Sequence, residues 1–325
     1  MAAGAVAARA GDLEPEWPCR VCGQRGGRLV IAHPEGRRWD VLRCATCGLM
    51  ALRDLPPMEE VAAFYQEDYY RSEDGRRFPA LMEAAVAWFR SRRAREIQQR
   101  CPPGSTVLDV GCGRGLILAT LQRRGYRVLG TQLSLTAARA IRARFGIHVL
   151  VGELPEAKFE ASSVDVAVIL HVLEHTRDPM LYLRTLHRLL KPGGWLLVEV
   201  PNAGCPTACR YGLDWLHWDI PHHLYHFDWA GLKWALTAAG FEIATVRTFS
   251  LEYGPFGVMQ AWLNRLFPGR RHFLYRHLSG LERDLPMFAV QAAVGGLLLP
   301  LALGRCVVDS VRSRGEVLTV WCRKR

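Results

Sequence analysis

Hydrophobic and polar residues alternate along residues 101–250 in two distinct rhythms. Short β-branched and apolar runs predict strands at 106–110, 127–131, 147–151, 164–170 and 195–200. Apolar residues at helical spacing predict helices between them, at about 115–124, 135–145 and 178–190. Strands that alternate with helices through short connections predict a parallel sheet with right-handed crossovers and helices on both faces.

The pattern continues on both sides of this region. A helical pattern at 79–100 ends at the breaker Cys101-Pro102-Pro103-Gly104 and predicts a helix that covers the sheet. Downstream, a helix at 230–239 precedes Gly240, and apolar runs at 241–250 and 317–322 predict two more strands. The sequence therefore predicts an α/β fold built on a seven-stranded sheet.

The N-terminal part carries two Cys-x-x-Cys pairs, Cys19/Cys22 and Cys44/Cys47, each followed by glycine. The residues between the pairs suit a β-hairpin, with strands at 29–31 and 39–42. Two such knuckles place four thiolates tetrahedrally around Zn²⁺ and leave no open position, so we expect a structural zinc. A redox dithiol would need one pair only, and four unrelated cysteines remain the plain alternative.

We divide the chain as follows: a disordered tail at 1–16, a zinc knuckle at 17–52, a linker and covering helix at 53–100, the core at 101–250, a helical insert at 251–315 and the last strand at 316–325. Residues 1–10 lack the apolar segment of a signal peptide, so we expect them to be a frayed tail. The linker holds the aromatic pairs Phe64-Tyr65 and Tyr69-Tyr70. Packing against the next domain and contact with a substrate are both open for them.

The stretch 107–115 holds Asp109 directly after a strand, followed by Gly111, Cys112, Gly113 and Gly115. A glycine triplet alone fits any tight turn between a strand and a helix. With the order of elements that follows, however, residues 104–202 resemble the class I S-adenosylmethionine (SAM)-dependent methyltransferases. The resemblance implies a Rossmann-like sheet whose last strand is antiparallel. It also implies that this loop wraps the amino-acid end of SAM, while Asp109 orients the loop and the ligand's ammonium.

The resemblance assigns further cofactor contacts. Gln132 stands where the family usually carries an acid for the ribose hydroxyls, so we expect a weaker or compensated contact there, with Leu133 beside it as a further cofactor contact. Glu153 and Leu154 follow the third strand, where the family binds adenine, although an exposed loop glutamate is equally consistent. His171, in a stretch similar to the family's "HxLEH", is expected to line the cofactor pocket, with Glu174 and His175 at its rim.

Residues 203–227 end in a segment similar to the "HHLYHF" of one group of these methyltransferases. A histidine near neutral pKa suits removal of a proton from an acceptor as the methyl transfers. His175, His222, His223 and His226 are therefore the candidate catalytic residues. Packing roles, and a metal held by the histidines of the segment, remain alternatives. The sequence has neither the Asn-Pro-Pro-Tyr loop nor the Pro-Cys nucleophile of nucleic-acid methyltransferases in this position.

The insert contains Leu285–Gly304, twenty residues without a charge. This length can cross a bilayer, but one crossing would separate two strands that must pair. Because Pro286, Gly295-Gly296 and Pro300 interrupt the stretch, we expect a bent hairpin or paired helices. Arginines beside apolar residues favour a peripheral contact of 255–312 with an anionic membrane. A helical lid or a dimer interface is the alternative.

Composition limits the class of protein. The 325 residues are 50% hydrophobic and carry a net charge of +11. The sequence lacks a dense basic tract interleaved with aromatics, so nucleic acid is an unlikely partner. Ten cysteines without a secretory signal favour a reducing, cytoplasmic compartment. We therefore expect a SAM-dependent methyltransferase acting on a small molecule, glycan or lipid-linked acceptor. RNA modification and a non-catalytic scaffold at a membrane surface remain alternatives.

Overall fold

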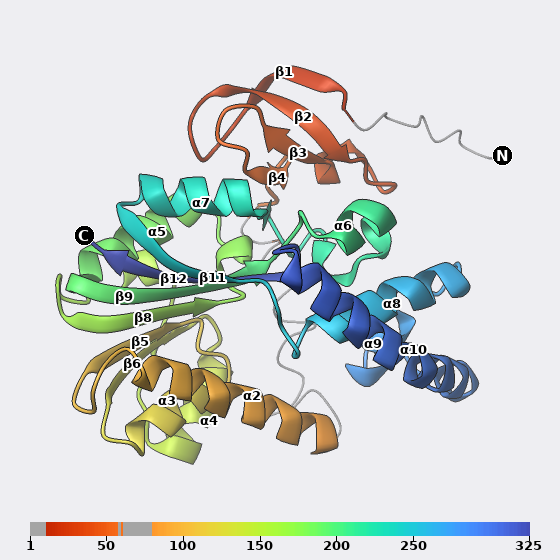
Figure 1. Ribbon diagram of the computed structural model, residues 1–325. Helices are drawn as coiled ribbons and strands as arrows, with labels where there is room; N and C mark the ends of the chain where they lie inside the picture. Colours follow the sequence, from red (N-terminus) through yellow and green to blue (C-terminus); the bar gives the residue numbers. More distant parts are fainter. Residues whose placement is uncertain (1–10, 58–59, 61–79) are drawn as a thin grey trace.

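The computed structural model describes residues 11–57, 60 and 80–325. The predicted frayed tail at 1–10 and the aromatic pairs at 64–65 and 69–70 lie outside the described residues. A seven-stranded sheet forms the centre of the protein, and two additions flank it: a thiol-bearing N-terminal module and a C-terminal helical insert (Figure 1).

The sheet has the order β11-β12-β9-β8-β5-β6-β7. Its strands are β5 (Thr106–Val110), β6 (Arg127–Gln132), β7 (Leu150–Val151), β8 (Val164–Leu170), β9 (Leu190–Pro201), β11 (Phe241–Arg247) and β12 (Val317–Lys324). The five strands from β5 to β9 are parallel, and β12 is inserted antiparallel between β9 and β11. The predicted seven-stranded α/β fold is confirmed, with boundaries that differ by a few residues.

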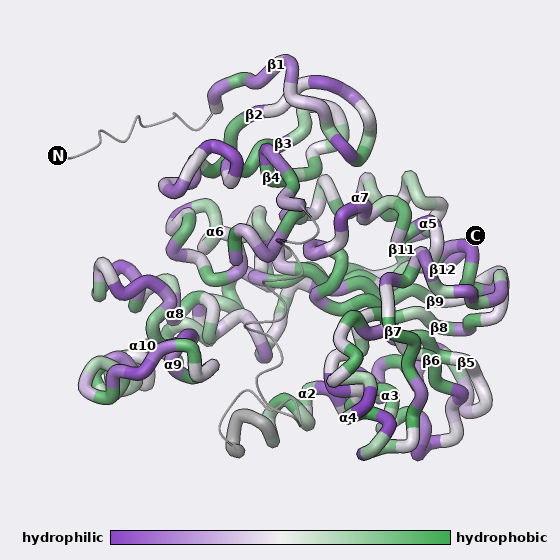
Figure 2. Tube along the Cα trace, turned by 180° about the vertical axis from the view of Figure 1, so that it is seen from behind, coloured by the Kyte–Doolittle hydropathy of each residue, from purple (hydrophilic) through white to green (hydrophobic). Residues whose placement is uncertain are grey.

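Helices cover both faces of this sheet (Figure 1). One face carries α5 (Pro179–Leu189) and α7 (Trp229–Ala238); the other carries α2 (Ala80–Gln98), α3 (Leu116–Gln122) and α4 (Leu135–Phe145). The central strands are predominantly hydrophobic (Figure 2), and their hydrophobic side chains are buried, as a doubly covered sheet requires. The carboxyl ends of the parallel strands therefore point to one edge, where a ligand has access to backbone groups.

The N-terminal module is a five-stranded antiparallel sheet of order β1-β2-β3-β4-β10. Its strands are β1 (Leu13–Pro18), β2 (Arg25–Ile31), β3 (Val41–Cys44), β4 (Met50–Leu52) and β10 (Tyr225–His226). The predicted hairpin is present. The predicted tail is wrong over residues 13–16, because β1 pairs with β2 and Trp17 packs against the glycine backbone of that strand.

The strand β10 joins the module to the core, which the sequence did not predict. Tyr225 pairs with Ala51 and His226 with Met50. The "HHLYHF" segment is thus shared between the core and the module, and the helical spacing of His222 and His226 has no structural meaning.

The insert consists of α8 (Gly254–Leu266), α9 (Phe273–Leu278) and α10 (Leu285–Val311), and a short helix α6 (Pro206–Tyr211) lies nearby. The predicted bent hairpin or pair of helices over 285–304 is wrong, because α10 is one helix of 27 residues. Pro300 has no N–H to bond the carbonyl of Gly296 one turn earlier, and both residues are exposed, so water has access to that carbonyl. Gly295 lets α10 approach α8 closely, since a Cβ there would stand 3.2 Å from the Met259 sulfur.

Candidate active site and thiol cluster

The glycine loop connects β5 to α3 in a conformation that needs glycine. Gly111, Gly113 and Gly115 have φ values of 63°, 54° and 69°, in the left-handed region that side chains disfavour. A Cβ on Gly111 would also stand 2.6 Å from the Val172 side chain, whereas no atom lies within 4 Å of one on Gly113. The loop therefore packs tightly against the protein at Gly111, whereas at Gly113 its backbone is free to contact a ligand.

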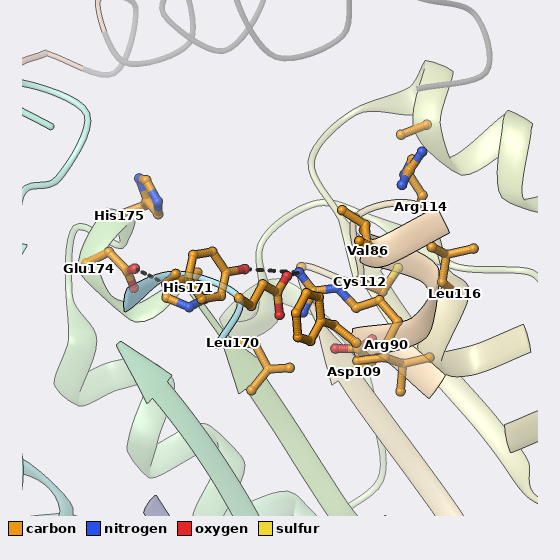
Figure 3. A pocket seen from close by; sticks show the side chains of 18 of the residues that line it. Val86, Arg90, Asp109, Cys112, Arg114, Leu116, Leu170, His171, Glu174 and His175 are labelled. Atoms are coloured by element: carbon orange, nitrogen blue, oxygen red, sulfur yellow. Dashed lines mark hydrogen bonds and ion pairs between the residues drawn. The ribbon is translucent and has the colours of Figure 1, made fainter. Parts of the chain in front are cut away.

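A cavity of about 570 Å³ begins at this loop (Figure 3). Of the residues predicted to bind the cofactor, Asp109, Gly111, Cys112, Gly113 and His171 line it. Gly115 is set back from the lining and begins the turn into α3. The side chain of Asp109 is buried, and burial raises its pKa to about 7.

Gln132 makes contacts within the protein at the predicted ribose position. Its Nε2 donates to the carbonyl of Gly113 at 3.0 Å, and its Oε1 accepts from the backbone N–H of Leu133 at 2.8 Å. Both ends of the amide thus brace the glycine loop against the start of α4. The side chain of Leu133 is 52% exposed. Neither residue lines the cavity.

The predicted adenine contacts also lie away from the cavity lining. Leu154 opens a 3-10 turn and is fully buried. Glu153 is directed toward Tyr182, and burial raises the pKa of its carboxyl despite that hydrogen bond. The cavity extends from the glycine loop toward α2 and the insert, past Phe89, Tyr253 and Tyr275.

His171 lies at the end of β8 with a φ of 53°. Its two ring nitrogens lie 3.4 Å from carboxylate oxygens of Glu174 and Glu199. Burial alone lowers the pKa of His171, but these carboxylates outweigh it and raise the pKa to about 9. Glu199 is paired in turn with Arg93 of α2. A chain of alternating charges therefore runs beneath the cavity. Glu174 is 1% exposed and not at the rim as predicted, because it points toward His171.

Polar groups of two segments form another wall of the cavity: His175 after β8, and His217, Asp219 and His223 of the loop-rich segment 203–227. Nδ1 of His175 donates to the carbonyl of His222 at 3.0 Å, and Nδ1 of His223 donates to the carbonyl of His217 at 2.9 Å. The rings of His175 and His223 meet edge to face at 4.5 Å. Burial lowers the pKa of His175 to about 4, so this ring is neutral at pH 7.

Two of the four candidate catalytic histidines line the cavity, and two do not. His175 and His223 line the cavity. His222 instead faces Asp219, with Nδ1 3.0 Å from Oδ1, and does not line it. His226 is buried in β10 beside Trp218, behind the wall.

Several cavity residues escaped the sequence prediction. Arg90 of α2 donates to Glu252 at 2.8 Å and to the Tyr253 hydroxyl at 3.0 Å, and all three line the cavity. These residues are far apart in the chain and no motif contains them. His217 and Asp219 lay within the predicted loop-rich segment, and the density of polar and aromatic residues there was the available signal.

The four cysteines of the two knuckles converge in the N-terminal module. Their sulfur atoms all lie within 4.8 Å of one another, with 3.7 Å between Cys19 and Cys47 and 3.6 Å between Cys22 and Cys44. Sulfurs placed ~2.3 Å from a tetrahedral zinc stand about 3.8 Å apart. Gly23 and Gly48, each with a φ of 74°, close the two turns around this point. The donor set and its spacing therefore fit zinc.

A parallel sheet with a glycine loop at the end of its first strand, closed by one antiparallel strand, defines the SAM-dependent methyltransferase fold. The family profile described as a methyltransferase domain matches residues 82–246, slightly more than half of the chain. The chain therefore belongs to the methyltransferase domain family, within the class I SAM-dependent methyltransferases.

Curated relatives carry the same kind of domain. A ubiquinone biosynthesis O-methyltransferase of Albidiferax ferrireducens is 33% identical over 118 residues, covering 33% of this chain and 45% of its own. A probable SAM-dependent methyltransferase of Mycolicibacterium smegmatis is 31% identical over 174 residues, covering 52% and 64%. The chain thus spans only 45% to 64% of the length of these two relatives.

Among solved structures, the SpnF 4+2 cyclase shares the fold at 20% identity and a TM-score of 0.50, covering 83% of this chain and 97% of that chain. This likeness concerns the fold alone.

Proposed function

We propose that this protein transfers a methyl group from SAM to a small-molecule acceptor. The observation that carries the proposal is one continuous cavity that joins the glycine loop to the histidine wall. SAM would lie against Asp109 and the loop, and the acceptor would lie in the cavity against His175 and His223. The reaction is an in-line displacement at the methyl carbon, so positioning and exclusion of water supply most of its catalysis.

A hydroxyl is the acceptor group that suits this wall best. Because Nδ1 of His175 and Nδ1 of His223 each donate to a carbonyl, the lone pair of each ring is on Nε2. Such nitrogens accept a hydrogen bond from a hydroxyl and orient its oxygen. The names of the O-methyltransferase relatives favour the same chemistry. A glycan or a lipid-linked molecule presents hydroxyls equally well.

The acceptor class is tested by incubating the protein with methyl-labelled SAM and an extract of its source organism, followed by separation into lipid, glycan, nucleic-acid and protein fractions. We expect label in the lipid or glycan fraction. Label in RNA would instead support the nucleic-acid alternative. Absence of both label and calorimetric SAM binding would contradict the proposal and favour a non-catalytic scaffold.

We also propose that the thiol cluster holds a structural zinc. Four protein thiolates would fill the tetrahedron, so this ion would shape the module and take no part in methyl transfer. Its position beside β4 and β10 supports a role in holding the HHLYHF segment.

A third proposal places the protein in the cytoplasm, peripherally bound to the inner face of the membrane through α10. This helix is long and apolar enough to cross a bilayer, and few of its residues are buried. Its outer side exposes leucines such as Leu297 (78%) and Leu301 (64%). The pairing of β11 with β12 holds both ends of the insert on one side, so α10 would lie in the interface. Residues 251–315 carry eight arginines against four acids, which suits anionic lipid.

Sedimentation with vesicles that contain phosphatidylglycerol tests this contact. The double variant Leu297→Glu/Leu301→Glu should bind at least about tenfold more weakly, because each leucine loses roughly 2 kcal/mol of apolar burial. Leu13→Glu, an exposed leucine in β1, is the matched control and should bind normally. A wild-type dimer in light scattering that the double variant abolishes, without vesicle binding, would identify a second copy as the occupant and overturn the membrane proposal.

A further inference from the structure

We infer that Glu174, His175 and His223 form a second metal site, in which a divalent cation binds the acceptor oxygen within the cavity. The inference rests on the proposed methyl transfer, which it deepens. Glu174 and His175 follow β8, and His223 comes from the HHLYHF segment. One ligand atom from each residue lies within 4.8 Å of the others. All three residues line the cavity that begins at the glycine loop.

The two histidines are held in the form that a metal requires. A metal-bound imidazole presents a lone pair on one nitrogen, while the other nitrogen donates to a carbonyl or a carboxylate. Here Nδ1 of His175 donates to the His222 carbonyl and Nδ1 of His223 donates to the His217 carbonyl. Both acceptors are backbone atoms, which cannot rotate away. The fold therefore fixes Nε2 as the ligating nitrogen of each ring.

The carboxylate of Glu174 supplies an independent observation. The side chain is buried, yet within residues 11–57, 60 and 80–325 neither oxygen accepts a hydrogen bond of normal geometry. Its one ion-pair contact there is with Nδ1 of His171 at 3.4 Å (Figure 3). Buried carboxylates normally satisfy several lone-pair sites, so this one is short of partners. A cation between Glu174 and the two histidines would supply the missing contact.

The backbone around the three side chains is held on both sides. The N–H of Leu224 donates to the carbonyl of Glu174 at 2.9 Å, which ties the segment after β8 to the HHLYHF segment. The N–H of Leu52 in β4 donates to the carbonyl of Leu224 at 3.0 Å. The two segments that carry the ligands are therefore joined to each other and to the N-terminal module.

Two imidazoles and one carboxylate leave coordination positions open toward the cavity. A nitrogen-rich set of this kind favours Zn²⁺, Mn²⁺, Fe²⁺ or Co²⁺ over Ca²⁺ and Mg²⁺. An acceptor hydroxyl that binds at an open position has its pKa lowered and loses its proton to water. Its oxygen then forms the new O–CH₃ bond as the S–CH₃ bond of SAM breaks, which leaves S-adenosylhomocysteine and a methyl ether.

Manganese is the suitable probe, because Mn²⁺ prefers oxygen and nitrogen ligands to thiolates. Full-length protein loaded with a single equivalent of Zn²⁺, which the four thiolates bind first, would be titrated with Mn²⁺ and the free ion measured by electron paramagnetic resonance. We expect one Mn²⁺ site per chain. Glu174→Gln and His223→Asn should each weaken it at least about tenfold, while thermal unfolding shows that the variants are folded.

His222→Gln is the matched control, since this histidine is adjacent to His223 but points to Asp219. The control should keep the Mn²⁺ site. Wild-type protein that binds no Mn²⁺ at millimolar concentration, ligand variants that bind it normally, or a control that loses it as they do would each overturn the inference.

Two readouts separate this inference from the proposed function. Calorimetry with SAM alone tests the cofactor site without any need for a cation. Methyl transfer that continues unchanged after EDTA has removed every cation except the thiol-bound zinc would refute the cavity cation and leave the methyltransferase proposal intact. Mn²⁺ binding without SAM binding would support the cavity cation and contradict the methyltransferase proposal.

Discussion

Two clusters of buried ligand groups in this protein differ in how many of their positions the protein fills. In the thiol cluster, four sulfurs lie within 4.8 Å of one another, which is the full ligand number of a tetrahedral ion. In the cavity, Glu174, His175 and His223 provide three ligand atoms within 4.8 Å of one another, and all three residues line the cavity. A closed set suits a structural ion, and an open set suits a site where a substrate binds. In the two proposed sites, the number of coordination positions left open therefore distinguishes a structural ion from one that binds a substrate.

The two clusters are close in the fold although their residues are far apart in the chain. A short path of backbone hydrogen bonds leads from β4 through Leu224 to Glu174. On the same side, Arg43 of β3 donates to Asp228, the N-cap of α7, at 2.6 Å. Loss of the closed cluster should therefore disturb the open one, whereas changes in the open one should leave the closed one intact.

We expect the largest effect from Cys44→Ala, which removes one ligand of the thiol cluster and tests whether that cluster holds zinc. Metal-binding free energy at such sites is on the order of 10 kcal/mol and is coupled to folding. We expect loss of bound zinc, proteolytic cleavage within residues 11–57, and reduced methyl transfer through displacement of the HHLYHF segment. Zinc is measured by mass spectrometry of the metal, and folding by limited proteolysis.

Cys209→Ala is the control for this experiment, because Cys209 is exposed and outside the cluster. It should retain zinc and resist the protease. Full zinc stoichiometry in Cys44→Ala would show that the ligand set is wrong, and an intact module without zinc would show that the ion does not hold the fold.

A second prediction concerns Asp109, which lines the open cavity, and the pH dependence of SAM binding. Burial raises the pKa of Asp109 to about 7, and only the charged carboxylate attracts the ammonium of SAM. As pH falls through 7 the carboxyl gains a proton, so affinity falls: the Kd for SAM should rise about tenfold between pH 8 and pH 6. Calorimetry at several pH values measures this.

Asp109→Asn should bind SAM weakly at every pH and show a flat profile. A steep profile in this variant would assign the titration to another group. An equally tight wild-type complex at both pH values would remove Asp109 from the cofactor site.

The sequence predicted local features of the core well. The glycine loop and the succession of strands and helices along the core depend on short segments whose residues determine their own turn, strand or helix. It did not predict the association of Arg90 with Tyr253, or of β10 with β4, because such contacts arise only when distant elements pack. In α10, Gly295 and Pro300 were taken as breaks. The glycine proves to be a close contact with α8, and the proline is tolerated on an exposed face.

The smallest expected effect comes from Gln132, where sequence and structure suggest different roles. The sequence placed its amide against the ribose, whereas its Nε2 donates to Gly113 and its Oε1 accepts from Leu133, so the described side chain is engaged by the protein. Like the four thiols, the Gln132 amide is therefore directed at other groups of the protein, although it lies beside the glycine loop. Gln132→Ala removes these braces, each contributing about 1 kcal/mol, and should raise the Kd for SAM by a few fold through a looser loop.

Gln132→Glu separates the two roles of this residue. Glutamate keeps the acceptor for the Leu133 N–H but replaces the donor to the Gly113 carbonyl with an anionic oxygen, so that two acceptors face each other. If the amide braces the loop, Gln132→Glu should bind SAM no better than Gln132→Ala. If the side chain instead serves the ribose, the added charge should strengthen the hydrogen bonds to both hydroxyls and tighten binding above wild type. Calorimetry on the three proteins at pH 8, where Asp109 is charged, decides between the roles. Tighter binding of SAM by the glutamate variant would show that the side chain at position 132 contacts the ribose.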